Sequence, residues 1–174
     1  TTLLSVIGAD EPGAALERVF DGRERHVVTP DDIRAAHGAL STARDGPLDA
    51  VALGTPHFSL AEFGAVVRLL DGRKVRSGLP FLISTSRAVR DLAAAQGWIA
   101  DLERAGVHIP VDVCTYYSPR IRAITGRVMT NAAKWAYYAP GMLKVEVAFG
   151  SLKECVESAV RGEVWRDPQL LTSQ

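Results

Sequence analysis

The chain has 174 residues, and its 20 basic and 20 acidic side chains give a net charge of zero at pH 7 and a pI of about 6.8. Such a balance lacks the basic surface of a nucleic-acid-binding protein, so we expect no nucleic-acid partner. No apolar run approaches the roughly 18 to 20 residues of a membrane span, and no signal-peptide pattern opens the sequence. We therefore expect a cytoplasmic protein with no membrane partner.

In chain order, short β-rich runs alternate with amphipathic stretches, a pattern that predicts an α/β fold with a mostly parallel sheet and helices on both faces. The stretches at 12–20 and 33–40 have helical spacing, and each should lay one face on the sheet. The predicted strands cover residues 3–7, 25–28, 50–53, 81–84, 107–113 and 144–149.

Three predicted helices begin with a capping signal. Thr29 offers a capping hydroxyl directly before Pro30, which suits the first helical position. Residues 59–62 and 151–154 both read Ser-Leu-x-Glu, which is a capping box. A long helix is expected from about 87 to 104, although Gly97 weakens it by about 1 kcal/mol relative to alanine. Its inward side chains should be Val89, Leu92, Ile99 and Leu102.

No internal repeat or long linker is visible, so residues 1–174 are predicted to form a single α/β lobe. Because the chain starts without methionine and at once resembles a strand, we expect it to be a fragment of a longer polypeptide. Its two cysteines, Cys114 and Cys155, show no sign of a disulfide, and no paired Cys/His spacing indicates a complete metal site. Any metal would therefore need ligands from elsewhere.

Four polar segments lie at or near the ends of predicted strands, at 54–59, 84–87, 114–119 and 130–134. The carboxyl ends of parallel strands share one edge, and ligands bind in the crevice outside it. Each segment also opens or approaches a helix amino terminus, which favours a carboxylate or a phosphate. The segments should therefore converge on one anion-binding face.

Several side chains in these segments have both a structural and a functional interpretation. His57 is either a hydrogen-bonded loop residue or a group that leans over an anion site, and Ser59 has a cap as its simpler role. Cys114 follows an apolar strand but has polar neighbours, so it is either core or a thiolate ligand or nucleophile. Cys155 lies on the apolar side of a helix and is expected in the core. Lys134 falls in the first turn of a short helix at 130–141, where a cation is unfavourable unless an anion is near.

At these segments the sequence resembles the aconitase X family, over roughly residues 49–164. Four motifs occur in order: Ala-Leu-Gly-Thr-Pro-His-Phe-Ser at 52–59, Val-Asp-Val-Cys-Thr-Tyr-Tyr-Ser-Pro at 111–119, Val-Met-Thr-Asn-Ala-Ala-Lys-Trp at 128–135 and Phe-Gly-Ser-Leu-Lys-Glu-Cys at 149–155. Ala132 and Tyr137 stand where the family more often has serine and histidine. These two departures bear on which substrate is used more than on the class of enzyme.

The resemblance implies an aconitase-like three-layer lobe and hydro-lyase chemistry on a small hydroxy carboxylate, such as cis-3-hydroxy-L-proline. It also implies an iron–sulfur cluster, 2Fe-2S or 4Fe-4S, that acts as a Lewis acid. The implied partners are the remainder of the catalytic chain and a small swivel domain or subunit. By the same resemblance Cys114 would ligate the cluster and His57 and Lys134 would be catalytic. The implied substrate-binding residues are Ser59, Ser118, Thr130, Asn131 and Tyr138.

Three other hypotheses stay open at this point. The chain could be a non-catalytic anion-binding or assembly domain that has lost the cluster. It could be a dehydratase of another substrate, such as a phosphorylated hydroxy acid, or an unrelated thiol enzyme that uses Cys114 with His57.

Overall fold

The computed structural model describes residues 27–55 and 57–168. The chain divides into two compact units, Thr1–Ile33 and Arg34–Gln174, and the sheet belongs to the second. The predicted elements at 3–7 and 12–20 lie outside the described residues, as do residues 25 and 26 of the strand predicted at 25–28. The rest of that strand is wrong, because Val27 and Val28 are exposed and belong to no strand. That all 174 residues form one lobe stays a prediction.

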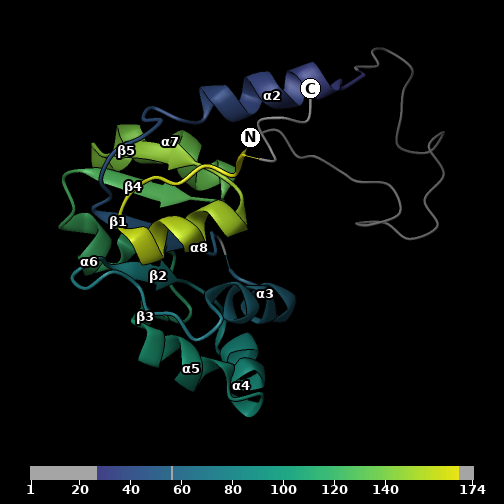
Figure 1. Ribbon diagram of the computed structural model, residues 1–174, viewed down its shortest axis with the longest axis vertical. Coiled ribbons are helices and arrows are strands. Elements are labelled where there is room, and N and C mark those ends of the chain that lie inside the picture. Colours follow the sequence, from purple (N-terminus) through teal and green to yellow (C-terminus); the bar gives the residue numbers. More distant parts are fainter. Residues whose placement is uncertain (1–26, 56, 169–174) are drawn as a thin grey trace. The chain divides into compact units, whose positions relative to one another are not determined.

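Five parallel strands form a single sheet in the order β3-β2-β1-β4-β5 (Figure 1). The predicted parallel sheet is thus confirmed, although β4 was missed and β3 is much shorter than predicted. The chain builds outward from β1 through β2 to β3 and then returns to the other side of β1 with β4. The strand order therefore reverses between β1 and β4. The strands are β1 (Ala50–Leu53), β2 (Phe81–Ile83), β3 (Val107–His108), β4 (Arg127–Thr130) and β5 (Glu146–Phe149).

Helices cover both faces of this sheet, as predicted, and two separate hydrophobic clusters result. Successive residues of β1 point to opposite faces, so Val51 and Leu53 belong to one cluster, and Ala50 and Ala52 to the other. The first cluster lies under α3 (Leu60–Leu70), α4 (Arg87–Ala95), α5 (Trp98–Ala105) and α8 (Leu152–Arg161). The second lies under the 3-10 turn η1 (Thr115–Tyr117), α6 (Pro119–Arg122) and α7 (Ala133–Leu143).

All three predicted helix caps are confirmed. The Thr29 hydroxyl accepts a bond from the amide of Asp32, at the start of α2 (Pro30–Ala39). In return the Thr29 hydroxyl and amide donate to the Asp32 carboxylate, at 2.7 and 2.9 Å, and these bonds hold the pKa of Asp32 below its ordinary value. Ser59 and Ser151 both complete reciprocal capping boxes, at the starts of α3 and α8.

The helix predictions at 87–104 and 33–40 need correction. The helix predicted from 87 to 104 is broken in two, because Gly97 takes a left-handed backbone (φ 79°) between α4 and α5. Leu92 is exposed, whereas Ile99 and Leu102 are buried as predicted. The stretch at 33–40 does not bury a full face, since α2 has no buried residue. Its contacts with the second cluster come from Leu40, just after the helix, and from the His37 ring, whose centroid is 5.0 Å from that of Phe149.

Candidate functional site

The polar segments after β1, β2, β3 and β4 all lie at the carboxyl edge of the sheet, because the strands are parallel. Side chains from two of these segments meet directly. The Thr55 and Thr115 hydroxyl oxygens are 3.1 Å apart, and the Thr55 hydroxyl is 4.0 Å from the Cys114 sulfur. The predicted convergence is thus observed for the loops after β1 and β3, next to the point where the strand order reverses.

His57 lies in the loop between β1 and α3, of which the structure describes residues 54, 55, 57 and 58. The two residues that follow β2 hold this loop from one side. We call it the His57 loop. The Ser84 hydroxyl donates to the Gly54 carbonyl, and the Thr85 hydroxyl donates to the Phe58 carbonyl at 2.7 Å. The Phe58 amide donates back to the Ser84 carbonyl at 2.9 Å. His57 itself is exposed. Buried hydrogen bonds therefore hold the backbone of a loop whose imidazole side chain is accessible to solvent.

Asp112, which the sequence analysis did not single out as a site residue, lies near enough to His57 for their charges to interact. Its backbone is left-handed (φ 56°), which is uncommon for a residue other than glycine and recurs at functional sites. Its carboxylate accepts bonds from the amide and the side chain of Arg87, at 2.9 and 3.1 Å. These bonds, with a smaller contribution from His57, hold the pKa of Asp112 below its ordinary value. The Arg-Asp-His arrangement could not be found from sequence spacing.

The two cysteines have different surroundings. Cys114 is half-buried at the carboxyl edge, whereas Cys155 is completely buried in α8. Burial raises the pKa of the Cys155 thiol far above its ordinary value, which makes a thiolate there unfavourable. The prediction that Cys155 is a core residue is confirmed. Cys114 is the cysteine that an incoming group can reach.

Tyr116 connects the Cys114 segment to the start of α7. Its hydroxyl donates to the Trp135 carbonyl at 2.8 Å and, less directly, to the Lys134 carbonyl at 3.2 Å. The Tyr116 and Trp135 rings stack with their centroids 5.4 Å apart. Burial raises the pKa of the Tyr116 phenol, and its neighbours Cys114 and Tyr138 add to that increase. The loop after β3 and the first turn of α7 therefore form one packed unit.

The helix predicted at 130–141 starts and ends later than expected. Thr130 is the last residue of β4, and α7 begins at Ala133 without a side-chain cap. The helix also runs through Pro140 to Leu143, because Ala139 and Leu143 on either side of it pack against the second cluster. Lys134 is exposed in the first turn, as predicted, and forms no ion pair within the described residues.

Three of the predicted substrate-binding side chains are buried or already engaged in hydrogen bonds. Ser59 already donates to Glu62 and accepts from the Glu62 amide, so no proton remains for an anion. Thr130 is fully buried, and its hydroxyl accepts from the Ala132 amide at 3.1 Å. Ser118 is also buried. Asn131, two residues before α7, is half-buried, and Tyr138, in the middle of α7, is exposed, so both remain accessible.

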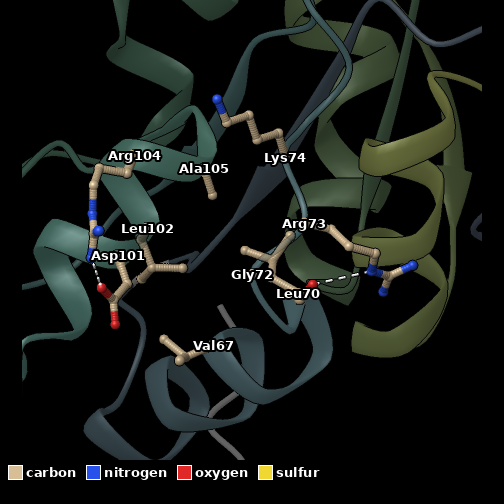
Figure 2. A pocket seen from close by; sticks show the side chains of 9 residues that line it. All are labelled: Val67, Leu70, Gly72, Arg73, Lys74, Asp101, Leu102, Arg104 and Ala105. Atoms are coloured by element: carbon tan, nitrogen blue, oxygen red, sulfur yellow. Dashed lines mark hydrogen bonds and ion pairs between the residues drawn. The ribbon is translucent and has the colours of Figure 1, made fainter.

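A cavity of about 490 Å³ lies away from these residues, at the opposite edge of the sheet (Figure 2). It is formed where α3 and α5 end, before β2 and β3 begin. Its arginines are already engaged, since Arg104 contacts Asp101 and Arg73 binds the Leu70 carbonyl and Glu157. Lys74 also lines the cavity, and no ion pair of Lys74 is seen in the part of the chain that the structure describes.

The described residues do not form a complete metal site. Among them, no three His, Cys, Asp or Glu side chains group closely enough to hold a metal ion. A cluster fits this edge only as a shared site, in which Cys114 supplies a single thiolate and other ligands come from elsewhere. None of the helices described here combines the length and apolar character needed to cross a bilayer.

The fold and the carboxyl-edge loops define an α/β domain of the aconitase type. The model of the aconitase X third domain matches residues 48–161, and the chain belongs to the aconitase X family. The crystal structure of Thermococcus kodakaraensis aconitase X in its holo-form is similar, with a TM-score of 0.65 and 28% identity. That likeness covers 76% of this chain and 33% of the other chain. The resemblance inferred from the sequence motifs is thereby confirmed.

Two curated relatives are dehydratases. The cis-3-hydroxy-L-proline dehydratase of Pseudomonas aeruginosa is 35% identical over 165 residues, which are 92% of this chain and 28% of that protein. The phosphomevalonate dehydratase large subunit of Methanocaldococcus jannaschii is 31% identical over 141 residues, 81% of this chain and 34% of that subunit. The chain thus spans about a third or less of the length of the relatives it matches.

Proposed function

We propose that the chain is the third domain of an aconitase X hydro-lyase, and that this enzyme dehydrates a small hydroxy carboxylate. Cis-3-hydroxy-L-proline is the substrate we favour, because similarity to the bacterial enzyme is higher and covers more of the chain. The observation that carries the proposal is the reachable Cys114 thiol, held beside Thr55 at the carboxyl edge of a domain from this family.

Cys114 would hold one iron of an iron–sulfur cluster, 2Fe-2S or 4Fe-4S. The cluster would supply a Lewis acid for the leaving hydroxide. The remaining ligands would come from the rest of the catalytic chain, and a small swivel domain or subunit would close the site. Two free cysteines support a reducing compartment, for which we propose the cytoplasm.

The residues of this chain would bind the substrate and move its proton. Dehydration breaks a C–H bond beside the carboxylate, and the electron pair forms the double bond as hydroxide leaves. His57 is exposed at the edge and would accept that proton, while the Lys134 ammonium would bind the carboxylate near the uncapped start of α7. Asn131, just before α7, and Tyr138, one helical turn after Lys134, would orient the substrate.

Ser59, Ser118 and Thr130 enter the proposal in a more limited way. Each is confined by a cap, a turn or burial, so each would shape the site through the backbone it fixes. A substrate contact from any of the three requires local rearrangement.

The experiment is a dehydration assay of the complete enzyme, reconstituted with iron and sulfide under anaerobic conditions. Loss of water from cis-3-hydroxy-L-proline, abolished in a Lys134→Ala variant with the cluster retained, is the expected result. An iron-loaded enzyme that turns over phosphomevalonate instead favours the phosphorylated substrate. A stable protein that binds carboxylates and never incorporates iron would overturn the proposal in favour of a binding domain.

A further inference from the structure

Ser84 and Thr85, at the carboxyl end of β2, have no role in the chemistry proposed above. Both side chains are completely buried, so neither can touch a substrate. Both hydroxyls nevertheless donate to carbonyl oxygens of the His57 loop, at Gly54 and at Phe58. Their contacts thus hold the first and last residues of the loop that presents His57.

Thr85 also contacts the segment that leads to Cys114. Its main-chain carbonyl accepts from the Asp112 amide at 2.9 Å, and its own amide donates to the Pro110 carbonyl at 3.2 Å. The side chain of Thr85 therefore fixes the His57 loop while its backbone fixes the chain two residues before Cys114. Thr85, two residues after β2, is thus hydrogen-bonded to both segments.

A second connection crosses the same space. The Thr55 hydroxyl is 3.1 Å from that of Thr115, which directly follows Cys114. This contact and the bond from Thr85 to Phe58 therefore tie residues on either side of His57 to the segment around Cys114. Phe58 adds rigidity, because its buried ring meets that of Phe63 edge-on with centroids 5.4 Å apart.

We propose that Thr85, assisted by Ser84, is a positioning residue that fixes the distance between His57 and Cys114. The inference rests on the proposed function, in which these two side chains serve proton transfer and cluster binding. Thr85 acts through the carbonyl of Phe58, the residue that directly follows His57. Loss of its hydroxyl leaves that buried carbonyl without its partner, so the loop relaxes and His57 shifts.

The test compares Thr85→Val, which keeps the shape and removes the hydroxyl, with Thr85→Ser, which keeps the hydroxyl. The matched control is Ser158→Ala in α8. Ser158 is also completely buried, and its hydroxyl also bonds to the backbone: it accepts from the Trp165 amide at 2.8 Å and donates to the Trp165 carbonyl at 3.5 Å. It lies outside the edge loops. Thr85→Val and Ser158→Ala should lower the melting temperature by similar amounts.

The first readout is the imidazole NMR signal of His57 in the 174-residue chain, assigned with a His57→Gln variant. Thr85→Val should move or broaden this signal, whereas Thr85→Ser and Ser158→Ala should leave it in place. The second readout is turnover of the complete enzyme, where Thr85→Val should lower kcat about 10- to 100-fold with little change in KM. Thr85→Ser should restore most of the lost rate.

The proposal fails if Thr85→Val matches Ser158→Ala in both readouts. If the Thr85→Val chain does not fold, Ser84→Ala replaces it, and an unchanged His57 signal in that variant also overturns the proposal. Absence of dehydration by the wild-type enzyme would refute the proposed function alone, because the NMR comparison needs no turnover.

Discussion

Gly54 follows strand β1 and begins the His57 loop, and its replacement by alanine should be unusually costly. Its backbone is left-handed (φ 77°), which costs a residue with a Cβ atom about 1 to 2 kcal/mol. A Cβ atom there would also overlap the Ser84 carbonyl oxygen and stand 3.2 Å from Phe58. The Ser84 carbonyl belongs to the backbone and cannot move without losing its bond from the Phe58 amide.

The two costs add to the expected magnitude. Leaving the buried Phe58 amide unpaired costs about 1 to 3 kcal/mol, so Gly54→Ala should lower the free energy of unfolding by about 2 to 5 kcal/mol. Gly78→Ala is the matched control, since Gly78 has a similar φ of 83° with no atom near its Cβ position. That variant should lose only about 1 to 2 kcal/mol.

Urea unfolding followed by circular dichroism measures both losses on the same chain. The difference between the two losses of unfolding free energy measures the effect of the close approach of Gly54 to Ser84, at the carboxyl end of β2. Equal losses in Gly54→Ala and Gly78→Ala would refute the inference that β2 holds the His57 loop tightly at this point.

Three more predictions concern other parts of the domain. The Arg73 guanidinium holds the pKa of Glu157 below its ordinary value of 4.5. Their pairing therefore stabilises the fold above that pH, and this stabilisation is lost as pH falls through the lowered pKa. Glu157→Gln should flatten the acid side of a curve of unfolding free energy against pH. Ser151→Ala should lower the free energy of unfolding by about 1 kcal/mol in urea titrations, and an unchanged midpoint would contradict the capping box. Iodoacetamide should modify Cys114 in the native chain and Cys155 only after unfolding, as peptide mass spectrometry would reveal; early labelling of Cys155 would argue against its burial.

Local patterns were sufficient to predict the elements whose signals lie within a few residues. The capping boxes at Ser59 and Ser151 depend on a partner three residues away, and β1 and β2 are short apolar runs between clear turns. Strand β4 was missed because residues 127–130 are ordinary in isolation. Only pairing with β1 on one side and β5 on the other makes them a central strand.

Tertiary packing also explains the helix corrections. The helical pattern continues across Gly97, yet the chain turns there and places Trp98 against the surface of Gly64 in α3. In α7 the burial of Ala139 keeps the helix intact despite Pro140. Neither effect is visible in the spacing of apolar residues along one segment.

The candidate site was predictable in its location more than in its contacts. Parallel strands place His57, Cys114 and Lys134 at one edge, and that inference needs only the strand–helix rhythm. The hydrogen bonds of Ser84 and Thr85 to the His57 loop span 30 and 27 positions, so no local pattern predicts them. The left-handed backbone of Asp112 is equally invisible in the sequence.

The central claim is that Cys114 binds an iron–sulfur cluster, and iron analysis of two cysteine variants tests it most directly. After anaerobic reconstitution of the complete enzyme, Cys114→Ala should lose iron, visible absorbance and dehydration of cis-3-hydroxy-L-proline together. Cys155→Ala, altered in the buried side of α8, should keep all three. Full iron content and full turnover in Cys114→Ala would contradict the account.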